Sequence, residues 1–213
     1  QTINIVAELA QVSNVYSMEF DTLINESVSA GNTLTNGFSQ LSISLWANFA
    51  SVPTTRVLGL ASKDHTNQRS FDFRYIQNTG VNFLVSTDGV NSGQTAYYPK
   101  ANINVGQWYH FVGVYDGSNV LLYVNGALFD GTSTLTGSLQ NTTSEFFIGK
   151  RGFSTTNTGF DGKLDEVAVF NTALTAREVK SIYLATEVVA GVNKTADLND
   201  LTTPPVKWYR MGD

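Results

Sequence analysis

The sequence predicts an all-β fold, a β-sandwich of two antiparallel sheets with one short C-terminal helix. Apolar and polar residues alternate in short segments, which is the period of a strand with one buried face. Gly, Asn, Asp and Ser separate these segments, and all four residue types favour turns. Only one stretch carries helix-capping signals. With 213 residues, the chain is long enough to bury the core of one such domain.

The first clear strand covers residues 40–50. One face carries only apolar side chains, those of Leu41, Ile43, Leu45, Ala47 and Phe49. The other face carries Ser42, Ser44, Trp46 and Asn48. We therefore expect a half-buried strand with one aromatic on its wetter face. The same alternation predicts strands at residues 71–75 and 81–85.

A three-stranded meander follows. Residues 108–115 form its first strand, which turns at 116–118 into a second at 120–124. Asn125-Gly126 then turns the chain toward a third strand, because this pair suits a type I′ turn with two positive φ angles. Two later apolar segments, 145–149 and 164–171, are predicted as further strands.

One helix is predicted to follow. Thr175 can cap it, Glu178 completes a capping box and Leu174 can pack on Val179. Val179, Ile182 and Tyr183 form its apolar stripe, and the helix should run to about Ala185. Residues 187–205 are polar and irregular, and residues 206–211 resemble a strand again. We expect an N-terminal arm at 1–12, a sandwich at 13–185, and a C-terminal extension at 186–213 that ends in a strand.

Composition excludes several classes of function. Thirteen basic against eighteen acidic residues disfavour nucleic acid as a partner. The absence of cysteine excludes disulfides, thiolate zinc sites and cysteine nucleophiles. We find no apolar run that could span a bilayer, so no membrane insertion is expected. No Lys or Arg precedes Arg56, whereas four acidic residues do, either by chance or to serve a cation.

Several motifs, taken in order, resemble a known family: MEFD (18–21), LSISLWANF (41–49), WYHFVGV (108–114), VLLYVNGAL (120–128), FFIGKR (146–151) and the stretch from Phe160 to Tyr183. The chain is similar to laminin G-like domains of the concanavalin A-like lectin/glucanase superfamily, in the version common in bacterial and phage surface proteins. The resemblance covers most of residues 13–185 and implies a jelly roll. The final WYRMGD resembles a strand that opens a further unit of this kind.

Calcium is the cofactor that the resemblance implies, since many such domains bind it. The positions carried over as metal ligands are Asp21 and Asp165, on first and last strands that are expected to be adjacent. Lys150 and Arg151 stand where pentraxin-type relatives place ligands, which speaks against a metal in that loop. The alternative for Asp165 is a buried acid that is hydrogen-bonded to backbone amides.

No catalytic residue is predicted. Glycoside hydrolysis needs two carboxylates that converge on one bond. Asp165 and Glu166 are neighbours, so the pleat of a strand should send them to opposite faces. His110 lies in mid-strand, where we expect a neighbouring side chain to satisfy it rather than a catalytic partner.

Sugar binding would use exposed aromatic rings together with polar side chains. The candidate ligand-binding residues are Trp46, Tyr97, Tyr98 and Phe153, with Lys150 and Arg151 as a grip for an anionic sugar. The alternative for the aromatics is core packing, and for the two cations a solvated loop. Trp108, at the start of a strand, is expected in the core.

The leading hypothesis is a non-catalytic carbohydrate-recognition or adhesion module on a cell or virion surface, with a cell-surface glycan as partner and one structural calcium. The alternative is a structural decoration or appendage protein of a virion, which contacts neighbouring structural proteins and binds no sugar. A glycoside hydrolase is a third, disfavoured reading.

Overall fold

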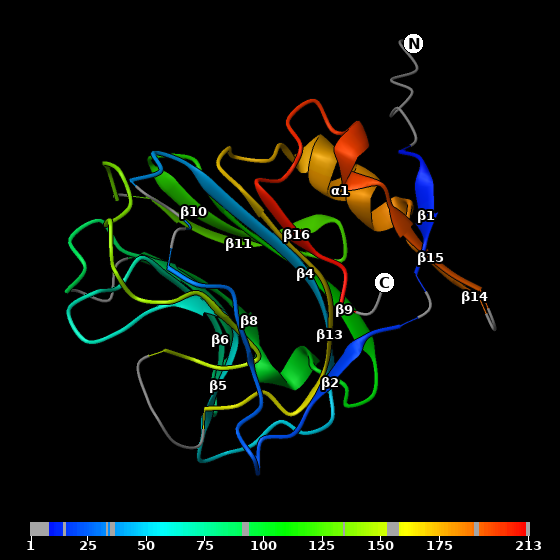
Figure 1. The fold of residues 1–213 in the computed structure, drawn as a ribbon, viewed down its shortest axis with the longest axis horizontal. Coiled ribbons are helices and arrows are strands. Elements are labelled where there is room, and N and C mark those ends of the chain that lie inside the picture. The colour runs from blue at the N-terminus through cyan, green and yellow to red at the C-terminus, as the bar shows by residue number, and fades with distance from the viewer. Residues whose placement is uncertain are drawn as a thin grey trace.

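The computed structural model describes residues 9–14, 16–32, 34, 37–90, 94–133, 135–152, 158–189 and 192–211. Two antiparallel sheets pack face to face, and the single α-helix of the described residues, α1 (Ala176–Leu184), lies outside them (Figure 1). The predicted β-sandwich is therefore confirmed. No helix among the described residues has the length and apolarity that crossing a membrane would require.

The first sheet has seven strands. Its path runs through β11 (Ala127–Ser133), β10 (Asn119–Val124), β9 (Trp108–Tyr115), β4 (Leu41–Phe49), β13 (Gly162–Phe170) and β16 (Lys207–Tyr209). The short strand β2 (Met18–Phe20) also pairs with β13. The predicted meander is confirmed as β9, β10 and β11, with Asn125 and Gly126 at positive φ in the turn.

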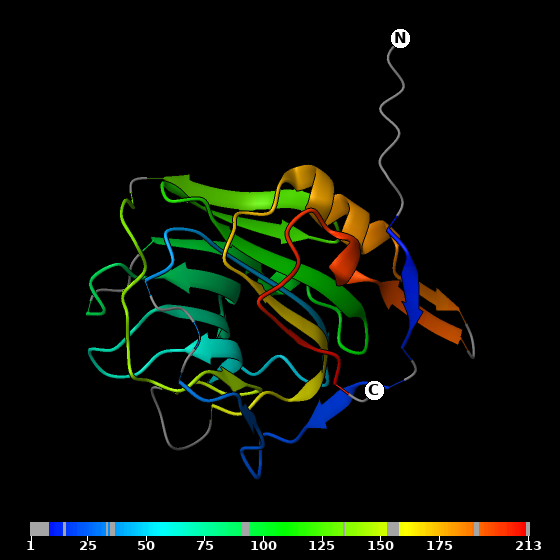
Figure 2. The ribbon, with the colours of Figure 1, turned by 45° about the horizontal axis from the view of Figure 1, so that its top comes forward.

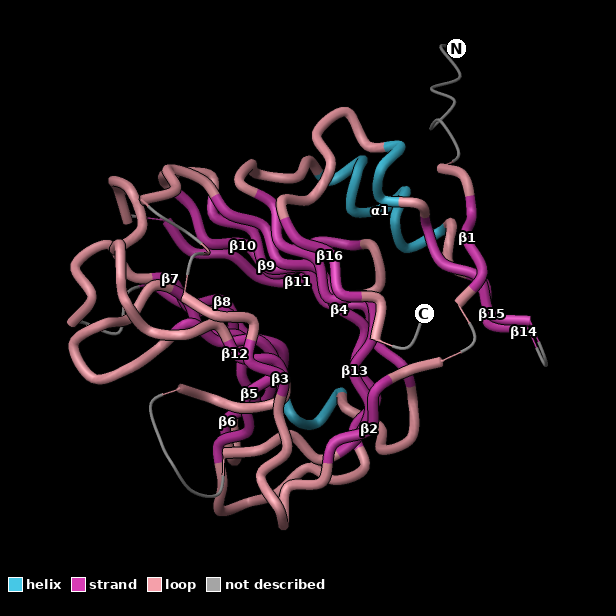
Figure 3. Tube along the Cα trace, viewed as in Figure 1, coloured by secondary structure: helices cyan, strands magenta, loops and turns pink. Residues whose placement is uncertain are grey.

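The second sheet has six strands, in the order β3 (Val28–Ser29), β12 (Phe147–Ile148), β5 (Val57–Lys63), β6 (Phe71–Ile76), β7 (Gly80–Val85) and β8 (Gln94–Pro99). A smaller sheet of β1 (Gln11–Ser13), β15 (Val192–Ala196) and β14 (Glu187–Val189) lies beside α1 (Figure 3). Two 3-10 turns, η1 (Lys100–Asn102) and η2 (Leu198–Asp200), complete the elements.

The main core fills the space between the two large sheets. The predicted inner face of β4, from Leu41 to Phe49, is fully buried at every second residue. Phe49 lies at the centre of an aromatic cluster, with ring centroids 5.1 Å from Phe160, 6.0 Å from Tyr75 and 6.5 Å from Phe111. Because aromatic rings bury the most area per residue, such a cluster stabilises a sandwich that has no disulfide.

The outer face of β4 was expected to be wet, and this expectation is largely wrong. Ser42 and Ser44 are buried, and the Ser42 hydroxyl donates to the carbonyl of Thr172. A second apolar cluster covers this face, where Val112 and Phe170 of the sheet pack with Ile182 of the helix. Figure 2 shows α1 along the outside of this sheet. An amphipathic helix must bury its apolar stripe, and the sheet's outer face is where it does so.

The helix begins where its capping signals placed it. The Thr175 hydroxyl accepts from the Glu178 amide, and the Glu178 carboxylate accepts from the Thr175 amide at 2.8 Å. Described residues near each end of the chain pack back onto the sandwich. β1 of the predicted arm pairs with β15 of the predicted extension, and β16, the predicted final strand, pairs with β13. β16, whose sequence resembles a strand that opens a further unit, is therefore a strand of this domain's own sheet.

Candidate functional site

The predicted site residues do not gather at one place. Lys150 and Arg151 follow β12, Tyr97 and Tyr98 lie on β8, and Trp46 lies on the outer face of β4. The predicted metal ligands Asp21 and Asp165 belong to the region of β2 and β13. Phe153 lies outside the described residues.

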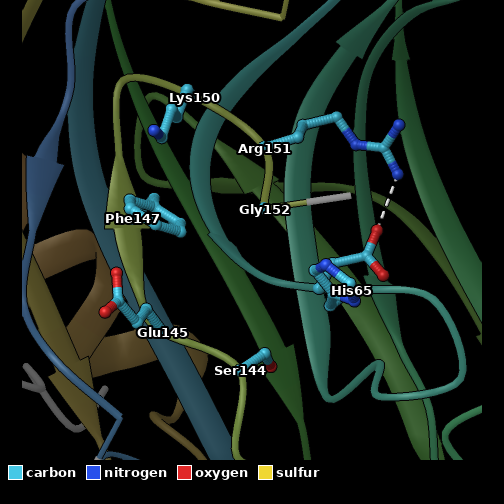
Figure 4. Close-up of a pocket in the computed structure, with 8 residues that line it drawn as sticks. His65, Ser144, Glu145, Phe147, Lys150, Arg151 and Gly152 are labelled. Atoms are coloured by element: carbon cyan, nitrogen blue, oxygen red, sulfur yellow. Dashed lines mark hydrogen bonds and ion pairs between the residues drawn. The ribbon is translucent and has the colours of Figure 1, made fainter. Parts of the chain in front are cut away.

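A pocket of about 260 Å³ lies beside β12 (Figure 4). Its lining residues are Asp64, His65, Ser144, Glu145, Phe147, Lys150, Arg151 and Gly152. Two glycines let the segment after β12 lie directly on β5. A Cβ on Gly59 would come within 2.2 Å of the Lys150 carbonyl carbon, and one on Gly152 within 2.4 Å of the Asp64 carbonyl oxygen.

Arg151 is buried in this pocket wall rather than exposed. Its Nη2 donates to Asp64 Oδ2 at 2.6 Å and its Nε to Asp72 Oδ2 at 2.8 Å. Burial alone would lower the pKa of Arg151, but Asp72 and Asp64 outweigh burial and raise it. Burial, with the Asp72 charge, also raises the pKa of Asp64. The expectation that Arg151 grips an anionic sugar or solvates a loop is corrected: its two hydrogen-bonding edges hold internal carboxylates.

Lys150 is half-buried, with its Nζ 4.3 Å from the centroid of the Phe147 ring. This cation–π contact occupies one face of Phe147, the one phenyl ring among the described lining residues. The charged residues of the lining are two acids, Asp64 and Glu145, and two bases, Lys150 and Arg151. Among its described lining residues, the pocket therefore offers one phenyl ring with a cation over one face, and no excess of one charge.

The two tyrosines of β8 differ in role. The Tyr98 ring packs 4.7 Å from Phe129 and 5.8 Å from Phe111, and its hydroxyl donates to the Asn102 carbonyl. Tyr98 therefore follows the alternative given for the aromatic residues, which is packing in the core rather than sugar binding. Tyr97 is 47% exposed at the edge of the six-stranded sheet.

Trp46 lines a different hollow, of about 370 Å³, on the outer face of the seven-stranded sheet. Its ring stacks 5.0 Å from His110 and 5.9 Å from Tyr183 of α1. Asn48 pairs with Trp108 across β4 and β9, so Trp108 stands on the same face as Trp46. The lining residues are Trp46, Gln107, Trp108, Asn125, Tyr183, Leu184 and Thr186. We call this site the tryptophan hollow.

The chemistry of the tryptophan hollow is neutral and aromatic. Trp46, Trp108 and Tyr183 are all half-buried, so each keeps part of its ring in contact with solvent. Asn125 is held in place because its Oδ1 accepts from the His110 amide at 2.9 Å. Gly126 lets Tyr183 approach, since a Cβ there would lie 2.9 Å from the ring. Rings beside side-chain amides suit the apolar faces and hydroxyls of a sugar.

Sequence reasoning missed Trp108 and Tyr183 as site residues. Trp108 was expected in the core, and Tyr183 in the buried stripe of the helix. Parity along residues 108–110 puts Trp108 and His110 on one face, but only the register between β4 and β9 brings that face beside Trp46.

His110 is a buried neutral group, as expected for a histidine satisfied by a neighbour. Its Nε2 lies 2.9 Å from the Ser44 hydroxyl, and its Nδ1 has no partner among the described residues. Burial lowers its pKa to about 3. A serine–histidine pair needs an accessible serine and an acid on the far nitrogen to act as a nucleophile. Ser44 is 2% exposed and no described acid is bonded to Nδ1, so the pair is structural.

The two predicted metal ligands are apart. Phe20 pairs with Gly162, which confirms that the strands are adjacent but places Asp21 four residues from Asp165 along β13, about 13 Å. Asp21 Oδ1 accepts from the Leu23 amide, and Asp165 Oδ2 accepts from Asn14 Nδ2 at 3.0 Å. Among the described residues, no three acidic or histidine side chains gather as metal ligands. These residues do not fit a shared calcium site, and calcium stays a prediction.

Asp165 and Glu166 do not point to opposite faces, which corrects the argument from the pleat. The pairing of β13 with β4 shifts register after Asp165, and Glu166 adopts φ of 51°. This bulge turns both carboxylates toward Asn14, whose Nδ2 donates to Glu166 Oε1 at 2.6 Å. Glu166 also accepts from Trp208 Nε1 and from the Thr195 hydroxyl. Glu166 thus ties the terminal segments to the sandwich.

Comparisons with known proteins agree with this fold. A family model described as the concanavalin A-like lectin/glucanases superfamily matches residues 22–180. No curated protein matches the chain. A solved structure from Bacteroides ovatus, described as that of a candidate carbohydrate-binding protein, is 18% identical with a TM-score of 0.66; the match covers 97% of this chain and 53% of that one. The chain thus spans about half the length of that relative.

Two further solved structures cover most of both chains. The heptameric SAP-like pentraxin from Limulus polyphemus is 16% identical, with a TM-score of 0.58 over 84% of this chain and 83% of that one. Domain 4 of AbnA, an extracellular arabinanase from Geobacillus stearothermophilus in complex with arabinotriose, is also 16% identical, with a TM-score of 0.58 over 82% and 80%. At these identities the likeness shows the fold.

Proposed function

This chain belongs to the concanavalin A-like lectin/glucanase superfamily, and we propose that it is a non-catalytic carbohydrate-binding module that recognises glycans through the tryptophan hollow. Carbohydrate as the ligand class is supported by two similar structures. The Bacteroides ovatus protein is described as a candidate carbohydrate-binding protein, and the AbnA domain is described in complex with arabinotriose. We further propose that it acts in adhesion on a cell or virion surface, with a cell-surface glycan as partner.

The observation that carries the proposal is the pair of half-exposed indoles on one sheet face. Trp46 and Trp108 offer ring surface, and Asn125 and Gln107 stand beside them with amide donors and acceptors. A sugar stacks its apolar CH groups on a ring and directs its hydroxyls to such amides. Among the described residues, the pocket beside β12 does not have this combination, because its lining holds one phenyl ring, with Lys150 over it, and no side-chain amide.

Binding without hydrolysis is supported by the lining of the hollow. A glycosidase needs two carboxylates flanking the scissile bond. No Asp or Glu lines the tryptophan hollow among the described residues. The adjacent carboxylates Asp165 and Glu166 are engaged with Asn14, Thr195 and Trp208 instead.

A glycan array with the folded chain, read with and without added calcium, tests the proposal. Trp108→Ala should lose at least about tenfold in affinity for any glycan found, because it removes one stacking face. Tyr97→Ala removes an exposed ring elsewhere and should bind as the wild type does. Failure of the folded protein to bind any glycan, together with stable incorporation into a larger particle, would favour the virion structural role.

A further inference from the structure

The tryptophan hollow is continuous with an open row of side chains that crosses four strands. Trp108 of β9 pairs with Asn48 of β4, Asn48 with Lys163 of β13, and Lys163 with Glu19 of β2. Directly paired residues of antiparallel strands stand on the same face, so these four side chains form one line across the sheet. We call it the cross-strand row. The four strands lie side by side in Figure 1.

We infer that the cross-strand row extends the tryptophan hollow into an elongated site for a neutral oligosaccharide chain, rather than a pocket for one sugar or an acidic glycan. This inference rests on the proposed function. It adds the length and the charge of the ligand, and it assigns Asn48, Lys163 and Glu19 as contacts beyond the hollow.

Exposure supports an extended site. Lys163 and Glu19 are exposed, and Asn48 and Trp108 are half-buried, so the whole row is open to solvent. The helix and the second apolar cluster cover Val112, Val114 and Phe170, which lie further along the sheet, and leave the row uncovered. Neighbouring strands lie about 4.8 Å apart, so four strands span about 14 Å, which suits several linked sugar rings.

The polar groups of the row are fixed at its centre and adaptable at its end. Asn48 Nδ2 donates to the Gly106 carbonyl at 2.8 Å, which holds the amide between Trp108 and Lys163. Lys163 and Glu19 are long, exposed side chains that can reach hydroxyls by hydrogen bonds. The aromatic end therefore provides stacking, and the far end provides hydrogen bonds.

Charge favours a neutral ligand. Among the residues whose side chains the structure describes, no charged one lines the tryptophan hollow, and His110 behind Trp46 is uncharged at neutral pH. On the row and beside it, Lys163 stands between Glu19 and Asp165, the residue paired with Trp46. One cation against two carboxylates gives an acidic sugar no net attraction. Of the two cations predicted to hold an anionic sugar, Lys150 and Arg151, Arg151 is held by Asp64 and Asp72.

Calorimetric titration with linear neutral oligosaccharides (arabino-, xylo- and cello-series, from disaccharide to hexasaccharide) tests this inference, with oligogalacturonates and sialyllactose as acidic probes. In the series that binds, affinity should rise with chain length until the row is filled and then level off. Binding should be nearly independent of salt, because no net charge is neutralised.

Lys163→Gln should weaken the longer chains about three- to tenfold and leave the disaccharide unchanged, whereas Trp108→Ala should weaken every length. Lys150→Gln is the matched control and should bind as the wild type does. Trp108→Phe replaces Trp108→Ala should the latter not fold.

Three results separate the failures. Binding of acidic glycans that depends on Lys163 would overturn the inferred neutral ligand and leave the proposed function intact. Equal affinity at every length, unmoved by Lys163→Gln, would overturn the elongated site alone. A folded protein that binds none of these glycans would overturn the proposed function itself.

Discussion

His110 should make the stability of the domain fall in mildly acidic solution. The folded state keeps this imidazole neutral down to about pH 3, because it is fully buried beneath Trp46 and its one hydrogen-bond partner among the described residues is the Ser44 hydroxyl. In the unfolded chain it takes up a proton below about pH 6.5. A depressed folded pKa means that this stability is present above pH 6.5 and is lost as the pH falls toward 3.

The magnitude follows from linkage. At about pH 5 the unfolded imidazole is about one and a half pH units below its pKa and is protonated, whereas at about pH 7.5 it is neutral. The folded state stays neutral at both values, so only the unfolded state is stabilised by the proton. At about 1.4 kcal/mol per unit, the free energy of unfolding should fall by about 2 kcal/mol through this residue alone. The carboxylates contribute their own pH dependence, so the effect must be isolated with a variant.

Urea unfolding followed by tryptophan fluorescence at the two pH values provides the assay. His110→Gln cannot take up the proton, so it should lose about 2 kcal/mol less than the wild type over this interval. His65→Gln is the matched control. It replaces the only other histidine, which lies on an exposed loop, and should lose as much stability as the wild type. Equal losses for the wild type and His110→Gln would refute the argument that burial holds His110 neutral.

Three further substitutions probe other parts of the fold by chemical denaturation. Arg151→Met should cost about 3 kcal/mol, since it removes the cation that joins the buried carboxylates of Asp64 and Asp72 and leaves Asp64 with Arg69 and Asp72 with Arg74; a loss below about 1 kcal/mol would contradict the ion-pair assignment. Glu166→Ala should cost a similar amount, because it removes the acceptor of three donors. Glu166→Gly should cost about 1 kcal/mol less than Glu166→Ala, because only glycine tolerates the positive φ of this position freely. A larger loss for Glu166→Gly than for Glu166→Ala would exclude this backbone effect. Thr175→Ala should cost about 1 kcal/mol and Thr175→Ser much less, and equal losses would mean that the cap hydroxyl does not stabilise α1.

Much of the fold could be predicted from local pattern. The alternation over residues 41–49 correctly assigned the buried face of β4, and the capping box correctly placed the start of α1. Both signals act within a few residues of chain, so the sequence contains them in full. The exposed outer face of β4 was predicted less well, because the helix that covers it is more than a hundred residues away.

The individual site residues depended on contacts between distant segments. The sequence predicted Arg151 as a surface cation, but Gly59 lets its backbone lie against β5, and this brings its guanidinium to Asp64 and Asp72. Strict alternation along the strand predicted that Asp165 and Glu166 point to opposite faces. Glu166 itself lies in the left-handed region, at a bulge, and this brings the two carboxylates to the same side.

The sequence by itself determined that this protein is a β-sandwich with an aromatic core, one capped helix and little charge. Only the tertiary structure decided which aromatics face solvent and which side chains stand in line. Alternation specifies the two faces of a strand, because successive side chains point to opposite sides. It does not specify which residue of another strand lies opposite. That register places Trp108 on the same face as Trp46 and pairs Asn48 with Lys163.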